Sequence, residues 1–230
     1  MTLRNDLEAQ VNKIFSEQWS ERKGQNVPSA EALRLSNDAV KLHAVVLYAD
    51  LSESTKLVDT KNDFFAAEVY KTYLHCSAKI IRSQSGEITS YDGDRIMAVF
   101  IGDRMNSRAA KAALQINDAR LNIINPILKK NYQSSNYEVQ HTIGIDSSDL
   151  FVARTGIRGS NDLVWVGRAA NHAAKLGSLS NDYPTRITQE VYQKLSDDCK
   201  FTNGKPMWEQ VTWNPMNRTI YRSTWHWSVS

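Results

Sequence analysis

Two acidic residues stand at chain reversals next to apolar runs. Asp50 ends the run 44–49, and Asp94 follows the Asp92-Gly93 pair that opens the run 95–100. If the two runs are neighbouring strands, the two carboxylates converge. Two hard oxygen ligands without a cysteine or histidine cluster favour Mg²⁺ or Mn²⁺ holding a phosphate chain. The competing interpretation is ordinary turn and helix-cap chemistry, in which aspartate is common.

A third stretch, residues 162–176, carries an amide and a cation that could act together. Asn171 and Lys175 are four residues apart in a predicted helix over 169–179, so they share one face. An amide that orients a sugar, next to a cation that meets phosphate charge, would stabilise a transition state. A solvated helix face is the alternative. The sequence has no Walker-type glycine loop, which argues against P-loop chemistry.

The elements that must position these residues follow from the hydrophobic periodicity. An amphipathic helix over 4–20 and a turn-rich linker over 21–38 precede a domain that begins at about Leu42. The predicted elements of that domain are a strand at 43–49, a long helix from Ser52 or Ser54 to Ile81, a hairpin of 87–91 with 95–101, a helix at 104–130, strands at 137–146, 150–156 and 162–167, and the helix at 169–179. This order predicts an α+β sandwich rather than a doubly wound parallel sheet.

The composition is that of an ordinary globular protein. Hydrophobic residues make up 41%, charged residues make up 23%, and the net charge is only +3, which gives no case for a nucleic-acid partner. Cys76 and Cys199 lack the spacing of a disulfide framework or a zinc site. No apolar run reaches the roughly 18 residues that span a bilayer, and the first residues do not show the charged-then-apolar pattern expected of a signal segment. We therefore expect a cytoplasmic protein without a membrane partner.

Taken together, the three stretches resemble the catalytic domain of the class III nucleotide cyclases over about residues 42–225. That family has a strand ending in Phe-x-Asp-Ile, a hairpin with Lys-x-x-Gly-Asp, and a strand and helix with Asp-x-x-Gly-x-x-x-Asn-x-x-x-Arg. The resemblance implies an α+β fold with a ferredoxin-like antiparallel sheet flanked by helices. It also implies a cyclase catalytic domain at 42–230, which the separately predicted N-terminal helix and linker at 1–41 precede.

The catalytic positions of the family carry over residue by residue. Asp50 and Asp94 match the two metal aspartates, and Leu51 matches the residue whose backbone carbonyl is a further metal ligand. Asn171 matches the asparagine that orients the ribose, and Lys175 stands where the family usually has a transition-state arginine. The resemblance implies two divalent cations, Mn²⁺ or Mg²⁺, and a nucleoside triphosphate substrate.

The same resemblance implies a homodimer with shared active sites. In this family two subunits lie head to tail, so that the aspartates of one chain face the asparagine and lysine of the other. Arg168 is a further candidate for binding the substrate, and either Arg168 or Arg218 would hold the γ-phosphate.

The positions that select the base depart from the purine pattern. The adenine-selecting lysine falls at Ser90, its acidic partner falls at Val164, and the aromatic residue two before Asp50 is Tyr48 rather than Phe. The tyrosine adds a phenol that can donate to or accept from a base edge. This pattern is similar to the pyrimidine cyclases of the bacterial anti-phage Pycsar systems. It implies conversion of UTP, with CTP in second place, to 3′,5′-cyclic UMP or cyclic CMP and pyrophosphate, and the product would act on a separate effector protein.

Two alternatives stay open at the level of sequence. One is a purine cyclase, adenylate or guanylate, with an atypical base pocket. The other is a degenerate cyclase domain that only binds nucleotide as a sensor. Retention of both aspartates and of Asn171 argues against the sensor, whereas Lys175 in place of arginine keeps it open.

Overall fold

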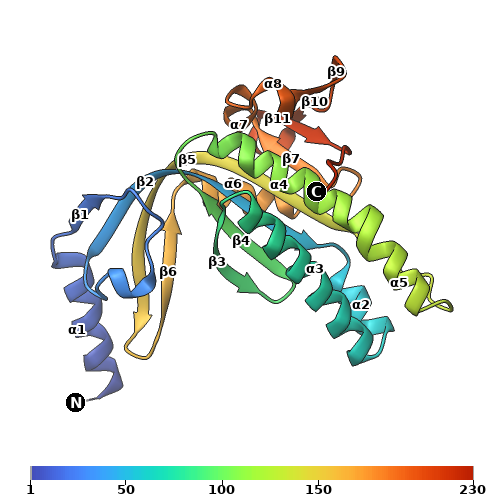
Figure 1. Cartoon of the computed structure of the whole chain (residues 1–230). Coiled ribbons are helices and arrows are strands. Elements are labelled where there is room, and N and C mark those ends of the chain that lie inside the picture. Colours follow the sequence, from blue (N-terminus) through green and yellow to red (C-terminus); the bar gives the residue numbers. More distant parts are fainter. Residues whose placement is uncertain (1, 230) are drawn as a thin grey trace. The chain divides into compact units, whose positions relative to one another are not determined.

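The computed structural model describes residues 2–229, which form two compact units (Figure 1). The first unit holds the residues up to His43 together with Asp149–Gly167, and the second holds Ala44–Ser148 together with the residues from Arg168 onward. Strands β2 (Asp38–Leu51) and β5 (His141–Ile157) contribute residues to both units. The division of the chain into 1–41 and 42–230 stays a prediction.

The first unit is built from helix α1 (Leu3–Ser16), strand β1 (Ser20–Lys23), strand β6 (Ser160–Val166) and the adjoining parts of β2 and β5. Strand β1 pairs in parallel with the start of β2, and β6 pairs antiparallel with the end of β5. The predicted linker over 21–38 therefore contains a strand. Its sequence lacks the alternation of polar and apolar residues that marks a half-buried strand, so periodicity could not reveal it.

The second unit contains a sheet in the order β10-β11-β7-β5-β2-β4-β3. Its elements are α2 (Ser54–Thr60), α3 (Asp63–Ser83), β3 (Glu87–Asp92), β4 (Arg95–Phe100), α4 (Met105–Ala119), a π-helical turn (Arg120–Ile124), α5 (Asn125–Asn131), α6 (Arg168–Gly177), β7 (Thr185–Thr188), α7 (Gln189–Gln193), α8 (Asp197–Lys200), β8 (Phe201–Thr202), β9 (Lys205–Pro206), β10 (Glu209–Trp213) and β11 (Arg218–Ser223). The β5–β7 pair is parallel and the pairs β2–β4, β3–β4, β7–β11 and β10–β11 are antiparallel. The expected α+β fold is confirmed, although its sheet is mixed rather than wholly antiparallel.

The core of the second unit lies on one face of this sheet. Alternate residues of β2 and β4 join a buried cluster with side chains of α3 and α4, such as Tyr73 and Leu114. Because side chains alternate along a strand, the intervening residues of β2, including Tyr48 and Asp50, point to the opposite face. The predicted site residues of β2 therefore lie on one face of the sheet, and the apolar core lies on the other.

Three stretches of the chain are divided into elements differently from the prediction. The long helix expected from Ser52 or Ser54 to Ile81 is two helices, because the side chain of Asn62 accepts a hydrogen bond of 2.9 Å from the Phe65 amide and starts α3 afresh. The helix expected over 104–130 contains the π-helical turn, which ends at Ile124 shortly before Pro126 and its missing amide donor. The strands expected at 137–146 and 150–156 are one strand, β5. The hairpin of 87–91 with 95–101 is confirmed.

Within residues 2–229, no helix combines the length and the apolar character that crossing a membrane requires.

Candidate active site

Strands β2, β4 and β3 align the predicted site residues in two rows on one face of the sheet. Asp50 on β2 lies opposite Arg95 on β4, which in turn lies opposite Asp92 on β3. Two residues away, Tyr48 lies opposite Met97, and Met97 lies opposite Ser90. Since directly paired residues project from the same face of a sheet, both rows share one surface. One row carries charge and the other carries neutral groups that could contact a base.

Arg95 binds the carboxylate of Asp50. Its Nη2 and Nε atoms donate to Asp50 Oδ2 at 2.7 and 3.1 Å, and the Asp50 side chain is only 16% exposed. Burial raises the pKa of Asp50, and the hydrogen bonds and charge of Arg95 oppose that effect. The bond to Asp50 also raises the pKa of Arg95. A cation that binds Asp50 therefore has to compete with a guanidinium for the carboxylate.

Asp94 lies in the two-residue turn between β3 and β4. Gly93, the other turn residue, has φ +60°, a conformation that glycine adopts without strain. The turn is centred one residue later than the predicted Asp92-Gly93 pair, so that Asp92 is the last residue of β3. The negative charges of Asp94 and Asp92 both act to raise the pKa of Asp50. The structure thus brings the carboxylates of Asp50 and Asp94 to one end of neighbouring strands, and their role as metal ligands stays a prediction.

A polar hollow of about 430 Å³ opens beside Asp50. It is lined by Asp50, Leu51, Ser52, Glu53, Arg95, Thr142 and the segment Gly177–Asn181. Its oxygen donors are hard ligands of the kind that Mg²⁺ and Mn²⁺ prefer. No group of three or more His, Cys, Asp or Glu residues able to hold a metal occurs in the described chain. Asp94 does not line this hollow. The Asp50 and Asp94 carboxylates with the Leu51 carbonyl would suit a cation whose remaining ligands are substrate phosphates and water, as is usual for Mg²⁺.

Tyr48 and Ser90 flank Met97 from the two neighbouring strands. Strands lie about 4.8 Å apart, so their backbones are separated by about 10 Å across β4. Tyr48 is half-buried, and the guanidinium carbon of Arg95 lies 5.9 Å from its ring centroid. Burial raises the pKa of the phenol, which therefore stays protonated at neutral pH and able to donate. The phenol makes no hydrogen bond within residues 2–229, which leaves it available to a ligand.

The other predicted catalytic residues lie on helix α6. Asn171 and Lys175 are exposed on the same face of the helix, and neither has a hydrogen-bonding or ionic partner in the described part of the chain. Neither residue lines the hollow beside Asp50. The structure therefore does not bring the two halves of the predicted site together through one hollow of one chain. Val164 lies on β6 in the first unit, where its side chain is 39% exposed.

Arg168, the first residue of α6, is engaged inside the second unit. Its guanidinium donates to both oxygens of Asp146 at 3.0 and 3.3 Å, to the Ser147 carbonyl at 2.5 Å and to Glu190 Oε1 at 2.7 Å. Arg218 also donates to Glu190 Oε1. These contacts favour a positioning role for Arg168 over direct contact with phosphate.

Sequence reasoning missed Arg95 and Asp146. Arg95 follows Asp94 directly, and the strand register that places it against Asp50 is not visible in the sequence. Asp146 stands at the end of the apolar run 143–145 in β5, and its side chain is 0% exposed. The position of Asp146 in an apolar strand could have indicated an ion pair, because a buried charge requires a partner.

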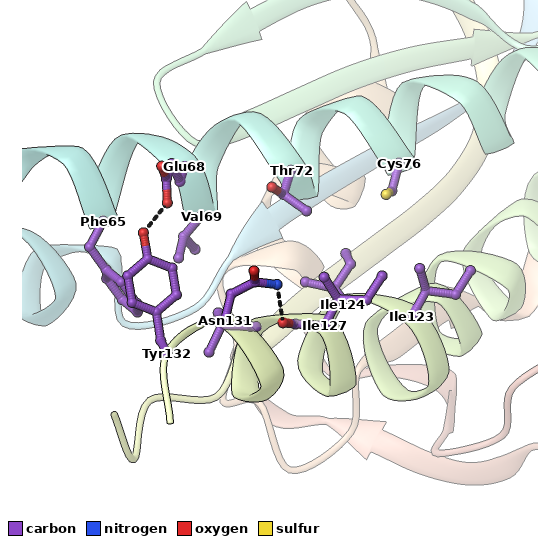
Figure 2. A pocket seen from close by; sticks show the side chains of 11 residues that line it. Phe65, Glu68, Val69, Thr72, Cys76, Ile123, Ile124, Ile127, Asn131 and Tyr132 are labelled. Atoms are coloured by element: carbon purple, nitrogen blue, oxygen red, sulfur yellow. Dashed lines mark hydrogen bonds between the residues drawn. The ribbon is translucent and has the colours of Figure 1, made fainter. Parts of the chain in front are cut away.

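A larger groove in the second unit has a different character. It has a volume of about 580 Å³ and lies between α3 and the segment of α5 with the preceding π-helical turn (Figure 2). Its floor is apolar, with Phe65, Val69, Ile124 and Ile127 among the lining residues. Polar side chains of its lining bind other groups of the same lining, since Tyr132 donates to Glu68 and Asn131 donates to the Ile127 carbonyl. Its eleven lining residues include no lysine or arginine, so it does not suit a triphosphate.

Comparison with known proteins defines the class to which this fold and site belong. Residues 39–210 match the family model of the adenylate and guanylate cyclase catalytic domain. The chain therefore belongs to this family, the class III cyclases. The solved structure of the guanylyl cyclase Cya2 superposes with a TM-score of 0.66 over 81% of this chain and 94% of that one, at 17% identity, and this likeness supports the fold.

Particular relatives are similar along the whole chain. A protein of Xanthomonas perforans named uridylate cyclase is 51% identical over 231 residues, and the match covers 100% of both chains. A protein of Burkholderia cepacia with the same name is 50% identical over 231 residues, again with 100% of both chains covered.

Proposed function

We propose that this chain is a pyrimidine nucleotide cyclase that converts UTP, with CTP as the second choice, to 3′,5′-cyclic UMP and pyrophosphate. The observation that carries the proposal is the end-to-end similarity to proteins named uridylate cyclase, at half of all positions. The surface formed by β2, β4 and β3 agrees with it, because Tyr48 and Ser90 occupy the positions at which purine cyclases read adenine.

Asp50, Asp94 and the Leu51 carbonyl would hold two divalent cations, Mn²⁺ or Mg²⁺. When bound, these cations supply positive charge against the triphosphate and favour loss of the proton from the ribose 3′-hydroxyl. The half-buried setting of Asp50 strengthens its attraction to a cation relative to a fully solvated carboxylate.

The reaction is an intramolecular displacement. The ribose 3′-oxygen forms a bond to the α-phosphorus, the bond from that phosphorus to the bridging oxygen breaks, and pyrophosphate leaves with the electron pair. The 3′-hydroxyl proton passes to solvent. Asn171 would orient the ribose, and Lys175 would meet the negative charge that develops on the phosphate oxygens. A lysine supplies the charge of the usual arginine without its planar, two-pronged geometry.

Tyr48 and Ser90 would read the pyrimidine. A uracil ring presents carbonyl acceptors, and the protonated Tyr48 phenol and the Ser90 hydroxyl can both donate to them. Neither position carries the lysine charge that a purine pocket of this family uses. The position of the acidic partner is Val164, whose apolar side chain makes no hydrogen bond to a base.

The direct test is product identification. Purified chain incubated with UTP and Mn²⁺ is expected to release cyclic UMP and pyrophosphate in equal amounts, as measured by mass spectrometry and a coupled pyrophosphate assay. Asp94→Asn, which keeps the turn but removes a carboxylate charge, is expected to lose activity by at least about a hundredfold. Pyrophosphate release without cyclic UMP would contradict the proposal.

The site is proposed to be shared between the two subunits of a homodimer. Support comes from α6, where Asn171 and Lys175 are exposed and stand apart from the lining of the Asp50 hollow. Asp50→Ala and Asn171→Ala chains, each inactive alone, should recover up to about half of the wild-type rate when mixed, because one of two sites is then intact. A mixed dimer without activity would contradict the shared site.

The product is proposed to act as a second messenger on a separate effector protein in anti-phage defence. The support for this role is the resemblance to the Pycsar pyrimidine cyclases. Loss of protection in cells that carry the Asp94→Asn chain together with an intact effector would test it.

A further inference from the structure

Helix α6 begins at a network of four charged residues that surrounds one buried carboxylate. The network, here called the Asp146 network, consists of Asp146 on β5, Arg168 at the start of α6, Glu190 on α7 and Arg218 on β11. The Asp146 side chain is 0% exposed. It accepts from Arg168 Nε at 3.0 Å, from the Thr188 hydroxyl at 2.6 Å and from the Ser147 amide at 2.7 Å. Hydrogen bonds from these three residues therefore fix the position of the Asp146 carboxylate.

Glu190 extends the network towards the edge of the sheet. One of its oxygens accepts from Arg168 at 2.7 Å and also from Arg218. Burial acts to raise the pKa of Glu190, but its own backbone amide and the charges of Arg168 and Arg218 outweigh that effect and lower it. Two guanidinium groups thus share one ionised carboxylate.

The network fixes the N-terminal end of α6, the helix that carries the predicted catalytic residues. Arg168, Asn171 and Lys175 are spaced by three and four residues and so lie along one face of the helix. A guanidinium held by two carboxylates has little rotational freedom, because its donors form a planar fork. The Ala169 amide adds a second tether, since it donates to the Ser148 hydroxyl at 2.9 Å. The first turn of α6 is therefore fixed in rotation as well as in position.

We propose that Asp146 and Glu190 are positioning residues for cyclisation, which act through Arg168 to place Asn171 and Lys175 against the ribose and the α-phosphate. This inference rests on the proposed function and adds a role that the reaction chemistry alone does not assign. Arg168 belongs to this positioning network and does not bind the γ-phosphate. Errors of about 1 Å in such placement cost on the order of a hundredfold in rate.

The test uses the shared site to distinguish a local effect of Asp146→Asn on the position of α6 from a loss of folding in the whole chain. In a mixed dimer of Asp146→Asn with Asp50→Ala, one site combines the aspartates of the Asp146→Asn chain with a wild-type α6. In a mixed dimer of Asp146→Asn with Asn171→Ala, no site has both an intact α6 and an intact asparagine. Asp146→Asn should therefore recover activity with the first partner and not with the second.

Several results would support the proposal together. Asp146→Asn alone should lower kcat for UTP by at least about tenfold and Glu190→Gln by a smaller factor, with KM changed less than threefold. Glu209→Gln is the matched control, because Glu209 accepts two bonds from Arg222 at 2.9 and 3.0 Å but does not contact α6. That control should keep the wild-type rate. The thermal midpoint and the far-ultraviolet circular dichroism of Glu190→Gln should stay within the range of the control.

The outcomes distinguish this inference from the proposed function. If Asp50→Ala and Asn171→Ala fail to complement each other, the shared site is wrong. If that pair complements but Asp146→Asn recovers with neither partner, Asp146 serves the fold as a whole and the inference is overturned. If Asp146→Asn does not fold, Glu190→Gln carries the same test, because its side chain is 30% exposed and its loss leaves no buried acid unpaired. Wild-type kcat in Glu190→Gln would then contradict the proposal.

Discussion

The Asp50 carboxylate combines burial with a competing positive charge. Burial makes the anion costly, and Arg95 relieves that cost through two hydrogen bonds. A divalent cation would provide a stronger partner, but it must first displace the guanidinium. If Asp50 binds a cation as proposed, Arg95 would stabilise the cation-free site and lower its affinity for the cation.

Removal of Arg95 should tighten cation binding. In Arg95→Ala the carboxylate of Asp50 would face the charges of Asp92 and Asp94 without compensation. A charge-assisted hydrogen bond contributes about 1.5–3 kcal/mol, so the Kd for Mn²⁺ without nucleotide should fall by about tenfold or more. Titration followed by electron paramagnetic resonance of free Mn²⁺ measures it. Arg222→Ala, which removes an arginine paired with Glu209, is the control. A weaker or unchanged affinity in Arg95→Ala would show that no competition takes place.

Removal of the Tyr48 hydroxyl should weaken recognition of the substrate base and leave the stability of the fold unchanged. It has no hydrogen-bond partner within residues 2–229, so Tyr48→Phe removes no internal contact. Loss of one hydrogen bond to substrate costs about 1 kcal/mol or more, so kcat/KM for UTP should fall by about fivefold to tenfold. Steady-state kinetics and a thermal melt measure the two effects. A lower melting temperature with unchanged kcat/KM would show that the hydroxyl stabilises the fold and does not contact the base.

At the scale of the element, α6 is placed by direct backbone contact as well as by the Asp146 network. A Cβ atom on Gly144 of β5 would lie 2.1 Å from the Ala173 carbonyl oxygen and 2.5 Å from the Gly177 amide. The helix therefore packs on the sheet at a distance that only glycine allows. The height of Asn171 and Lys175 above the sheet depends on this contact.

A side chain at Gly144 should lift α6. Gly144→Ala has to displace backbone atoms, and such overpacking costs about 1–3 kcal/mol of unfolding free energy. The rate of cyclisation should fall by at least about tenfold, because Asn171 moves with the helix. Urea denaturation and a turnover assay measure these changes. Gly177→Ala is the control for stability, since its nearest neighbours would lie at 3.6 Å, an ordinary contact distance. Equal stability of the two variants would show that the close contact at Gly144 does not limit the packing of α6.

How far the sequence predicts the structure depends on the element. The hairpin of β3 and β4 is readable because an Asp-Gly pair separates two strand-like runs, although the turn itself is formed by Gly93 and Asp94. The break between α2 and α3 at Asn62 and the continuity of β5 through residues 147–149 depend on tertiary pairing, which periodicity does not encode. At the site, Asp50 and Asp94 could be proposed from the residues themselves, and Tyr48 and Ser90 from the resemblance to the cyclase family. Arg95 and Asp146 could not, because their partners come from distant parts of the chain.

At the scale of the whole molecule, the second unit holds the sheet, its core and the residues proposed for catalysis, apart from Val164 in the first unit. Its core contains one histidine in an unusual setting. His141 is 1% exposed, and its ring centroid lies 5.7 Å from that of Tyr73. Burial, together with the charge of Arg120, lowers the pKa of His141 to about 3. The fold therefore holds this imidazole in its neutral form.

Acid should destabilise the protein through His141. The pKa in the folded chain lies below the ordinary value of 6.5, so the stability that neutral His141 permits is complete above pH 6.5 and is lost as the pH falls towards 3. At pH 4.5 the loss is about 3 kcal/mol. His141→Leu should lose correspondingly less between pH 7.5 and 4.5, as measured by urea denaturation. His75→Leu, at an exposed position of α3, is the control. Equal acid sensitivity in all three proteins would rule out this role of His141.

The proposed function requires that the site on this fold prefers pyrimidine to purine triphosphates. It is tested most directly by competition, in which the wild-type chain receives UTP, CTP, ATP and GTP together at equal concentration with Mn²⁺, and the cyclic products are quantified by mass spectrometry. Cyclic UMP is expected to be the main product and cyclic CMP the second, and the two purine products together are expected to form a minor fraction. Cyclic AMP or cyclic GMP in excess of the pyrimidine products would contradict it.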